Sequence, residues 1–182
     1  MMNGLNLLKA SLTKDNYDDL SIILGYEIDS CLKLFYSSYE LGKDGFLNAY
    51  RSFDQIRIPI NFVEFRDEDL GILLRLSHFY NRSDISRRWR EDIQYNDVYK
   101  KYNLLPIAYT EISLEQIYTN PKDGGEVFIF RNNERISLSD NIFEFCSKLT
   151  ETEILDEEFK NKNLYKNWGE DFWRIRDDEK PI

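Results

Sequence analysis

The part of the sequence that most constrains the fold is a strand, a tight turn and a second strand near residues 126–138. An unbroken apolar run, residues 127–130, precedes the pair Asn132-Asn133, and a second strand-like run occupies residues 135–138. Asparagine tolerates the positive φ angles of a two-residue type I′ turn, so this pattern predicts a hairpin. A run that is apolar on both faces is typical of a central strand covered on both sides. We therefore expect the whole run to be largely buried, namely Val127, Phe128, Ile129 and Phe130.

A third strand and a helix complete this unit. Residues 114–119 can pair with residues 126–131 across residues 120–125, which are rich in turn-forming types. Asn141 and Glu144 have the spacing of a capping box, which predicts the start of a helix. The expected buried face of this helix comprises Ile142, Phe145, Cys146 and Leu149. The sequence thus predicts a three-stranded antiparallel meander closed by an amphipathic helix, with a further short apolar segment at residues 106–109.

Helical periodicity dominates the N-terminal part of the chain. Apolar residues at positions 28, 32, 35 and 39 share one helix face and predict a helix from about Asp29 to Leu41. Asp29 is its expected N-cap, and Gly42 is its expected C′ residue in the left-handed conformation. A weaker pattern predicts another helix from Leu5 to Leu12.

An acidic segment separates two apolar runs in the middle of the chain. Residues 62–65 and 70–76 flank the segment Arg66-Asp67-Glu68-Asp69. We interpret this pattern as a strand, a turn and a strand with an acidic tip, in which Gly71 can form a bulge. The second run also fits a helical period, so a helix at that position stays an alternative.

Residues 83–102 predict one helix, and they lie in the only basic segment of the chain. Ser83 or Asp84 can cap the helix, and its apolar positions are Ile85, Trp89, Ile93 and Tyr99. A nucleic-acid patch at residues 87–90 is one interpretation. We favour a solvated helix face with local ion pairs, because the chain as a whole repels phosphate.

The charge balance disfavours polyanionic partners. The 182 residues include 24 basic and 33 acidic side chains, which give a formal net charge of −9. Nucleic-acid binding needs cations that neutralise phosphate, and anionic membrane surfaces attract basic segments. The aromatic content of 15% is typical of a globular chain. We expect one domain in residues 1–150, followed by an acidic, aromatic extension in residues 151–182 that packs on the domain or trails from it.

Few residues suited to metal or cofactor chemistry are present. The chain has one histidine, His78, and two cysteines, Cys31 and Cys146, which we interpret as buried small hydrophobic residues. We interpret His78 as a residue that closes a strand, because no motif identifies a partner that would orient it as a catalytic base. Glycine-rich phosphate loops do not occur. We therefore expect no catalytic residue, no metal and no cofactor.

Targeting signals are also missing from the sequence. No stretch approaches the roughly 18 apolar residues of a membrane span, and the N-terminus lacks the cationic and apolar regions of a secretory signal. We therefore expect no membrane partner and a cytoplasmic location.

The order of several short motifs resembles the SUKH superfamily. These motifs are Leu104-Leu105-Pro106-Ile107-Ala108, Ile117-Tyr118, Gly125-Glu126-Val127-Phe128-Ile129-Phe130 and the helix start Ser139-Asp140-Asn141-Ile142-Phe143-Glu144-Phe145-Cys146. They are similar to strands and a closing helix of that superfamily, and residues 27–39 are similar to one of its earlier helices. The resemblance implies an α+β domain in which helices flank a central antiparallel β-sheet, built as a meander.

The resemblance also implies a function. Many bacterial members are immunity proteins, which bind and neutralise a toxin domain, often a nuclease, without catalysis; others are regulatory or scaffold modules. We expect a protein partner of this kind, and a monomer or weak homodimer. The exposed tip formed by Asp67, Glu68 and Asp69 is the expected contact, because an acidic surface attracts a basic toxin. A hydrolase with paired carboxylates is a less favoured interpretation, because no motif selects such a pair.

Overall fold

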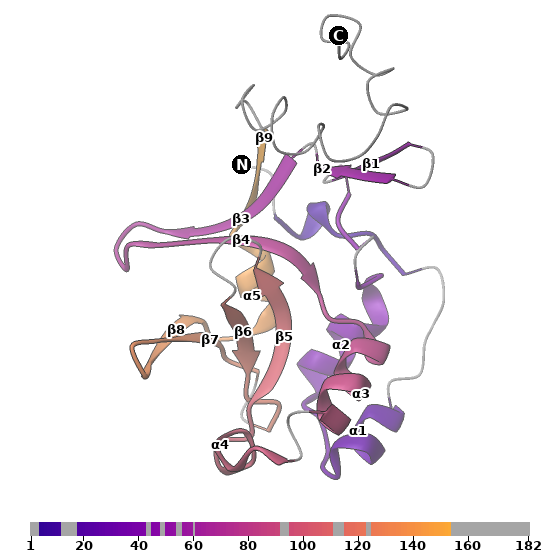
Figure 1. Ribbon diagram of the computed structural model, residues 1–182, viewed down its shortest axis with the longest axis vertical. Helices are drawn as coiled ribbons and strands as arrows, with labels where there is room; N and C mark the ends of the chain where they lie inside the picture. Colours follow the sequence, from indigo (N-terminus) through magenta and orange to yellow (C-terminus); the bar gives the residue numbers. More distant parts are fainter. Residues whose placement is uncertain are drawn as a thin grey trace, which may run out of the picture.

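The computed structural model of the chain describes residues 4–11, 18–42, 45–47, 50–53, 56–59, 61–91, 95–110, 115–122 and 125–153. Its main feature is a curled, seven-stranded antiparallel sheet in the order β8-β7-β6-β5-β4-β3-β9, with helices around it (Figure 1). A separate two-stranded sheet pairs β1 (Tyr50–Phe53) with β2 (Ile56–Pro59). The predicted α+β class, with a central antiparallel sheet flanked by helices, is confirmed.

The large sheet is a meander with one returning strand. Its strands are β3 (Asn61–Asp67), β4 (Ile72–Phe79), β5 (Leu105–Thr110), β6 (Gln116–Thr119), β7 (Val127–Arg131), β8 (Glu134–Ser139) and β9 (Leu149–Glu153). Each strand from β3 to β8 pairs with its neighbour along the chain, whereas β9 returns to the opposite edge and pairs with β3. The predicted meander is confirmed as β6, β7 and β8. Residues 127–131 form β7, an internal strand between β6 and β8, as predicted for a central strand, while β5 is the middle strand of the seven.

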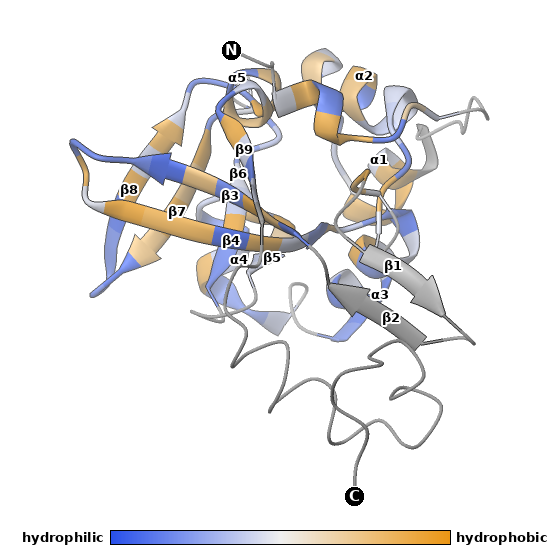
Figure 2. Cartoon of the chain, turned by 90° about the horizontal axis from the view of Figure 1, so that it is seen from above, coloured by the Kyte–Doolittle hydropathy of each residue, from blue (hydrophilic) through white to orange (hydrophobic). Residues whose placement is uncertain are grey.

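The helices are α1 (Asp18–Leu24), α2 (Ser30–Ser38), α3 (Arg82–Glu91), α4 (Asp97–Lys101) and α5 (Ile142–Ser147), with a 3₁₀ turn η1 (Gly4–Leu7) before them. Figure 2 shows α2 and α5 together on one side of the sheet and α4 on the other side. We call the side that α2 and α5 cover the inner face, and the opposite side the outer face. The inner face forms the main core, because α5 packs Phe145 on Phe65 of β3 in a stacked pair with ring centroids 4.9 Å apart.

Strand β7 contributes to both faces of the sheet. Val127 and Ile129 belong to the main core on the inner face, and Phe128 is equally buried on the outer face. Phe130 is only partly buried. The run is therefore largely buried, as predicted, but Phe130 is less covered than the other three residues because the outer face near the end of β7 is incompletely covered.

Helix α2 begins where the sequence predicts and ends earlier. The Asp29 side chain accepts a hydrogen bond of 2.7 Å from the Cys31 amide, which confirms it as the N-cap. The helix ends at Ser38, and Tyr39 is already extended, so Gly42 is not the C′ residue. Gly42 has a φ of 96°, and its amide donates a hydrogen bond to the Phe79 carbonyl. It therefore connects the loop after α2 to β4.

Two other helix predictions need correction. The expected helix from Leu5 to Leu12 is only the short η1 turn, because the chain then forms single β-bridges from Leu8 to Phe46 and from Ala10 to Tyr39. The expected helix over residues 83–102 is two helices, α3 and α4. Neither Ser83 nor Asp84 is the N-cap of α3: Asn81 accepts from the Asp84 amide at 2.9 Å, and Asp84 accepts in return from the Asn81 amide.

Both predicted hairpins form. Residues 68–71 connect β3 to β4, and Gly71 has a φ of 63° in this turn, so the helix and bulge alternatives are wrong. Asn132 and Asn133 have φ values of 52° and 64°, which confirms the left-handed two-residue turn between β7 and β8.

Helix α5 has the predicted N-cap. The Asn141 side chain accepts a hydrogen bond of 2.9 Å from the Glu144 amide, while the Glu144 carboxylate accepts from the Asp140 amide and not from the Asn141 amide.

The end of the described chain lies in the sheet. Leu149, which was expected on the helix, starts β9, and this strand extends to Glu153. The rest of the expected extension, from residue 154 onward, lies outside the described residues. Of the two cysteines, Cys146 is fully buried and burial raises the pKa of its thiol well above its usual range, whereas Cys31 is partly exposed.

Candidate functional site

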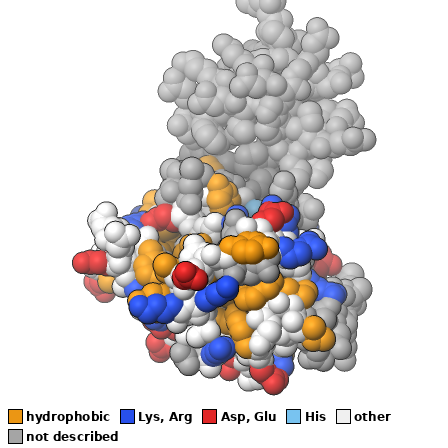
Figure 3. Space-filling model, turned by 60° about the horizontal axis from the view of Figure 1, so that its bottom comes forward, with side chains coloured by type: hydrophobic (Ala, Val, Ile, Leu, Met, Phe, Trp, Pro, Cys, Tyr) orange, Lys and Arg blue, Asp and Glu red, His pale blue; other side chains and the backbone are white. Residues whose placement is uncertain are grey.

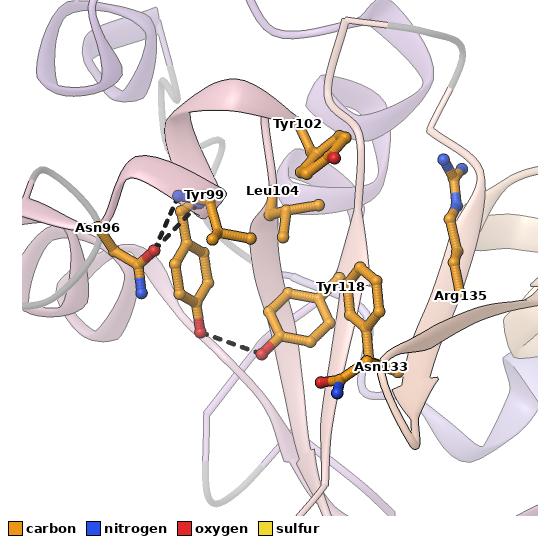
Figure 4. A pocket seen from close by; sticks show the side chains of 9 residues that line it. Asn96, Tyr99, Tyr102, Leu104, Tyr118, Asn133 and Arg135 are labelled. Carbon is orange, nitrogen blue, oxygen red and sulfur yellow. Dashed lines mark hydrogen bonds between the residues drawn. The ribbon is translucent and has the colours of Figure 1, made fainter.

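A groove with a volume of about 560 Å³ opens on the outer face of the sheet (Figure 4). It is lined by Asn96, Val98, Tyr99, Tyr102, Leu104, Tyr118, Phe130, Asn133 and Arg135. Four of the nine side chains are aromatic, and only one carries a charge. We call this feature the aromatic groove.

Two strands form the floor of the aromatic groove. Side chains alternate between the faces of a strand, so Tyr118 on β6 and Phe130 on β7 both lie on the outer face. Their rings meet edge to face with centroids 5.8 Å apart, and both contact the buried ring of Phe128. These three rings form a second apolar cluster, separated from the main core by the sheet itself.

Helix α4 forms one wall. Asn96 caps this helix, because its side chain accepts hydrogen bonds from the amides of Val98 and Tyr99. The cap orients Tyr99 so that its hydroxyl lies 3.0 Å from the Tyr118 hydroxyl. Burial, together with this hydrogen bond, raises the pKa of Tyr118 far above its usual range. The pair of hydroxyls thus fixes the wall to the floor.

The hairpin between β7 and β8 forms the opposite side of the groove. Asn133 is one of the two left-handed residues of its turn, and Arg135 follows on β8. The Arg135 guanidinium lies over the Phe128 ring with its Cζ 4.1 Å from the centroid, and it also pairs with Glu126. These two contacts hold the Arg135 side chain across the sheet rather than away from it.

Apolar side chains at the rim of the groove are open to solvent. Val98 and Tyr102 on α4 and its flank are 54% and 51% exposed, and Tyr95 before the helix is 76% exposed. Figure 3 turns this end of the molecule forward and shows apolar side chains gathered across it, with Lys, Arg, Asp and Glu side chains among and around them. Exposed apolar surface of this kind is typical of an interaction site.

The predicted acidic tip lies elsewhere. Asp67 ends β3, and its carboxylate accepts from the Leu70 amide at 3.0 Å, while Glu68 and Asp69 are exposed in the turn. The hairpin projects from the body of the molecule (Figure 1). Its exposed leucines, Leu70 at 49% and Leu73 at 42%, add an apolar component that the sequence reading did not single out. In the order of the sheet, strand β5 lies between this hairpin and the strands of the aromatic groove.

The buried carboxylate of Glu64 lies outside both the aromatic groove and the acidic tip. Glu64 on β3 is 1% exposed and accepts from the Arg75 guanidinium at 2.6 Å and from the Thr152 hydroxyl at 3.0 Å. The carboxylate therefore connects three strands of the sheet, β3, β4 and β9. Its partners are cationic and hydroxyl groups, which suits a structural ion pair.

His78 and the arginines of α3 also have local partners. His78 is the penultimate residue of β4, as expected of a residue that closes a strand, and its ring packs near Tyr80 and Tyr109. Arg87 forms ion pairs with Asp84 and Glu91 on the same helix. These pairs agree with the interpretation of this basic segment as a solvated helix face.

Within the described ranges, no group of three or more His, Cys, Asp or Glu residues is placed to hold a metal ion. In the same part of the chain, every helix is too short or too polar to cross a membrane.

No protein-family model matches the chain, and no curated protein matches it. The fold and the groove thus define it as an α+β protein with an open aromatic site. The sequence analysis did not predict this groove. Tyr118, Phe130 and Arg135 alternate with core residues on three strands, and that alternation was the available signal.

Proposed function

We propose that this chain is a non-catalytic immunity protein that binds and neutralises a toxin domain. An immunity protein of this kind acts in the cytoplasm, where a toxin such as a nuclease would meet its target. It acts as a monomer or weak homodimer and needs no cofactor, because binding alone blocks the toxin.

The observation that carries the proposal is the open aromatic groove with its exposed apolar rim. Tyr and Arg dominate the residues that contribute most to protein–protein binding energy, and aromatic residues are enriched at the centre of interfaces. Tyr99, Tyr102, Tyr118, Phe130 and Arg135 provide this composition in one place. Exposed Val98 supplies aliphatic surface beside them.

The acidic tip and the net charge support a basic partner. The chain carries a net charge of −9, and Glu68 and Asp69 are exposed at the end of a projecting hairpin. Opposite charge steers partners together and raises the association rate, chiefly at low ionic strength. Nucleases are commonly basic because their substrate is a polyanion.

The motifs behind the SUKH resemblance add support of a different kind. The segment 104–108 falls on and before β5, the segment 125–130 falls on β7, and the segment 139–146 leads into α5. Each motif thus occupies an element of the type that the resemblance implies. We propose membership of this superfamily on that ground.

A regulatory or scaffold module is the second candidate, since the same groove would serve a cellular partner that is not a toxin. The hydrolase interpretation gains nothing from the buried carboxylate, because Glu64 faces Arg75 and not a second carboxylate.

The test uses a purified toxin domain encoded next to this chain's gene. Stopped-flow measurements compare the wild type with a variant in which Asp67→Asn, Glu68→Gln and Asp69→Asn are combined. We expect association to slow by about tenfold at low salt, because Debye screening is weakest there. A control variant, which combines Glu27→Gln, Glu40→Gln and Asp140→Asn at exposed sites, has the same net charge and should associate faster than the tip variant.

Two results would count against the proposal at different levels. Equal association rates for the tip and control variants would remove Asp67, Glu68 and Asp69 from the contact. If neighbouring genes and purified complexes yield no toxin domain, the immunity function fails and the scaffold function replaces it.

A further inference from the structure

The outer edge of β8 borders the aromatic groove. In the described part of the chain, β8 is an end strand of the sheet and pairs only with β7. The two-residue turn makes Arg131 and Glu134 the closing, hydrogen-bonded pair of the hairpin. Hydrogen-bonded and non-hydrogen-bonded pairs alternate along an antiparallel ladder, so the backbone N–H and C=O of Arg135 and Ser137 point away from β7.

Arg135 joins this edge to the groove. Its side chain lines the groove, while its backbone groups face the open edge. A strand added along β8 would place the side chain opposite Arg135 on the outer face, since directly paired residues share a face. A large side chain at that position reaches across the arginine toward Phe130 and Tyr102.

The size of the groove fits more than one side chain. A volume of about 560 Å³ lies in the range of sites that enclose a small molecule. In an extended chain, alternate side chains lie on one face about 6.6 Å apart, so two neighbours can enter the same groove. A helix cannot pair with the β8 edge in this way, because its own backbone N–H and C=O groups are already hydrogen-bonded within the helix.

The charge of the groove favours an acidic flank on its occupant. Arg135, the only charged residue among the nine that line the groove, is already paired with Glu126. Lys100 and Lys101 are exposed on α4, and Lys101 Nζ lies 4.9 Å from the centroid of the Tyr102 ring, which lines the groove. These two lysines place positive charge at the rim of the groove, in a chain whose net charge is −9.

We propose that the β8 edge and the aromatic groove together bind an extended segment of a partner protein, which adds a strand to the sheet. The segment carries a large aromatic side chain opposite Arg135 and an acidic residue next to it. Backbone hydrogen bonds along β8 supply affinity, and the groove supplies specificity. This inference rests on the proposed function only in taking the partner to be a protein.

The test pans a phage-displayed library of random twelve-residue peptides against the full chain. Enriched sequences should share an aromatic residue with an acidic neighbour, and a synthetic peptide of that sequence is then titrated. Ser137→Pro removes an outward N–H without removing a bond to β7, and proline is tolerated on an edge with its N–H side in solvent. Ser137→Ala is the matched control, and Val98→Glu places a charge at the exposed rim of the groove.

We expect the peptide to bind Ser137→Pro and Val98→Glu at least tenfold more weakly than the wild type, and Ser137→Ala within twofold. Amide hydrogen exchange of the wild type gives a readout that needs no folded variant. Added peptide should slow exchange at Arg135 and Ser137 by at least tenfold, with little change at Glu134 and Ile136, whose amides face β7.

Three results would overturn the proposal: no enriched sequence, equal binding to wild type and Val98→Glu, or unchanged exchange at Arg135 and Ser137. A dimer in sedimentation velocity that Ser137→Pro abolishes would assign the edge to a second copy and also overturn it. The two proposals can fail separately. A toxin domain that binds the wild type and Ser137→Pro equally would keep the immunity function and remove only the added strand, and a peptide that binds β8 when no toxin exists would leave the added strand without the immunity function.

Discussion

The two faces of the large sheet bury aromatic side chains in different ways. On the inner face, helices α2 and α5 seal the core, and Phe65, Phe79 and Phe145 are at most 3% exposed. On the outer face, the short helix α4 covers only part of the aromatic cluster, and Phe130 and Tyr118 stay partly accessible. The inner face has the composition of a core, whereas the outer face combines aromatic rings with hydroxyl, amide and guanidinium groups.

This difference separates stability from function. A sealed face contributes most by removing apolar area from water, and it tolerates change poorly. A half-covered face contributes less to folding and keeps surface available for a partner. We therefore expect substitutions on the two faces to divide between loss of stability and loss of binding.

The largest expected effect compares one phenylalanine from each face. Phe145→Ala on the inner face should lower the free energy of unfolding by about 3–5 kcal/mol, because it opens a cavity in a packed core. Phe130→Ala on the outer face should lower it by about 1–2 kcal/mol, since a partly buried ring gains only part of the full burial energy. Urea unfolding followed by circular dichroism measures both. Equal losses would show that the outer face is as tightly packed as the inner one.

A second test adds volume to the inner face. Gly4 in η1 lies close to the backbone between α5 and β9. A Cβ atom at this position would clash with the carbonyl oxygens of Cys146 and Leu149 and would lie 2.8 Å from the Leu149 amide nitrogen. Gly4→Ala should therefore cost about 1–3 kcal/mol, as overpacking usually does. Gly25→Ala is not a suitable control because of its positive φ; Ser137→Ala, on the exposed edge, should stay within about 0.5 kcal/mol. A Gly4→Ala protein as stable as the wild type would mean that η1 moves freely on α5.

A smaller effect concerns the two hydroxyls that fix α4 to the outer face. Tyr118→Phe leaves the Tyr99 hydroxyl without this partner and should cost about 0.5–1.5 kcal/mol. The double variant with Tyr99→Phe should cost less than the sum of the two single variants, because the second change removes a group that has already lost its bond. Additive costs in thermal unfolding would show that the hydroxyls do not interact.

The smallest effect appears only at alkaline pH. The folded state raises the pKa of Tyr118 far above the usual value near 10, so the native chain keeps a proton that the unfolded chain loses. Stability from this group is complete below pH 10 and falls as the pH rises further. Tyr118→Phe should make the fall between pH 10 and 11.5 shallower, as followed by urea unfolding at each pH. An unchanged slope would mean that the Tyr118 hydroxyl is accessible in the folded state.

Local signals account for the parts of the fold that the sequence predicts well. Asn132-Asn133 supplies the left-handed turn, Asn141 caps α5, and Asp29 caps α2, and each depends on a few adjacent residues. The misjudged helix over residues 83–102 also contains such a signal. Asn96 is a good N-cap, but apolar residues continue at helical spacing on both sides of it, and this spacing favoured one helix over two.

Long-range pairing explains what the sequence does not predict. Nothing near residues 149–153 indicates that this strand crosses to the far edge and pairs with β3. The aromatic groove likewise combines α4, β6, β7 and β8, and its members come together only when the register of two strand pairs, β6–β7 and β7–β8, is known. The acidic tip was predictable as a turn, because a single hairpin forms it.

The return of β9 to β3 has a consequence for synthesis on the ribosome. Strands β3 to β8 follow one another in the sheet, so each can pair as soon as it leaves the exit tunnel, but the outer edge of β3 waits until residues 149–153 emerge. Until then the nascent chain exposes an open strand edge, a template for pairing with other chains. Products of premature termination before residue 149 should therefore aggregate, and pairing of residues 149–153 with β3 covers that edge.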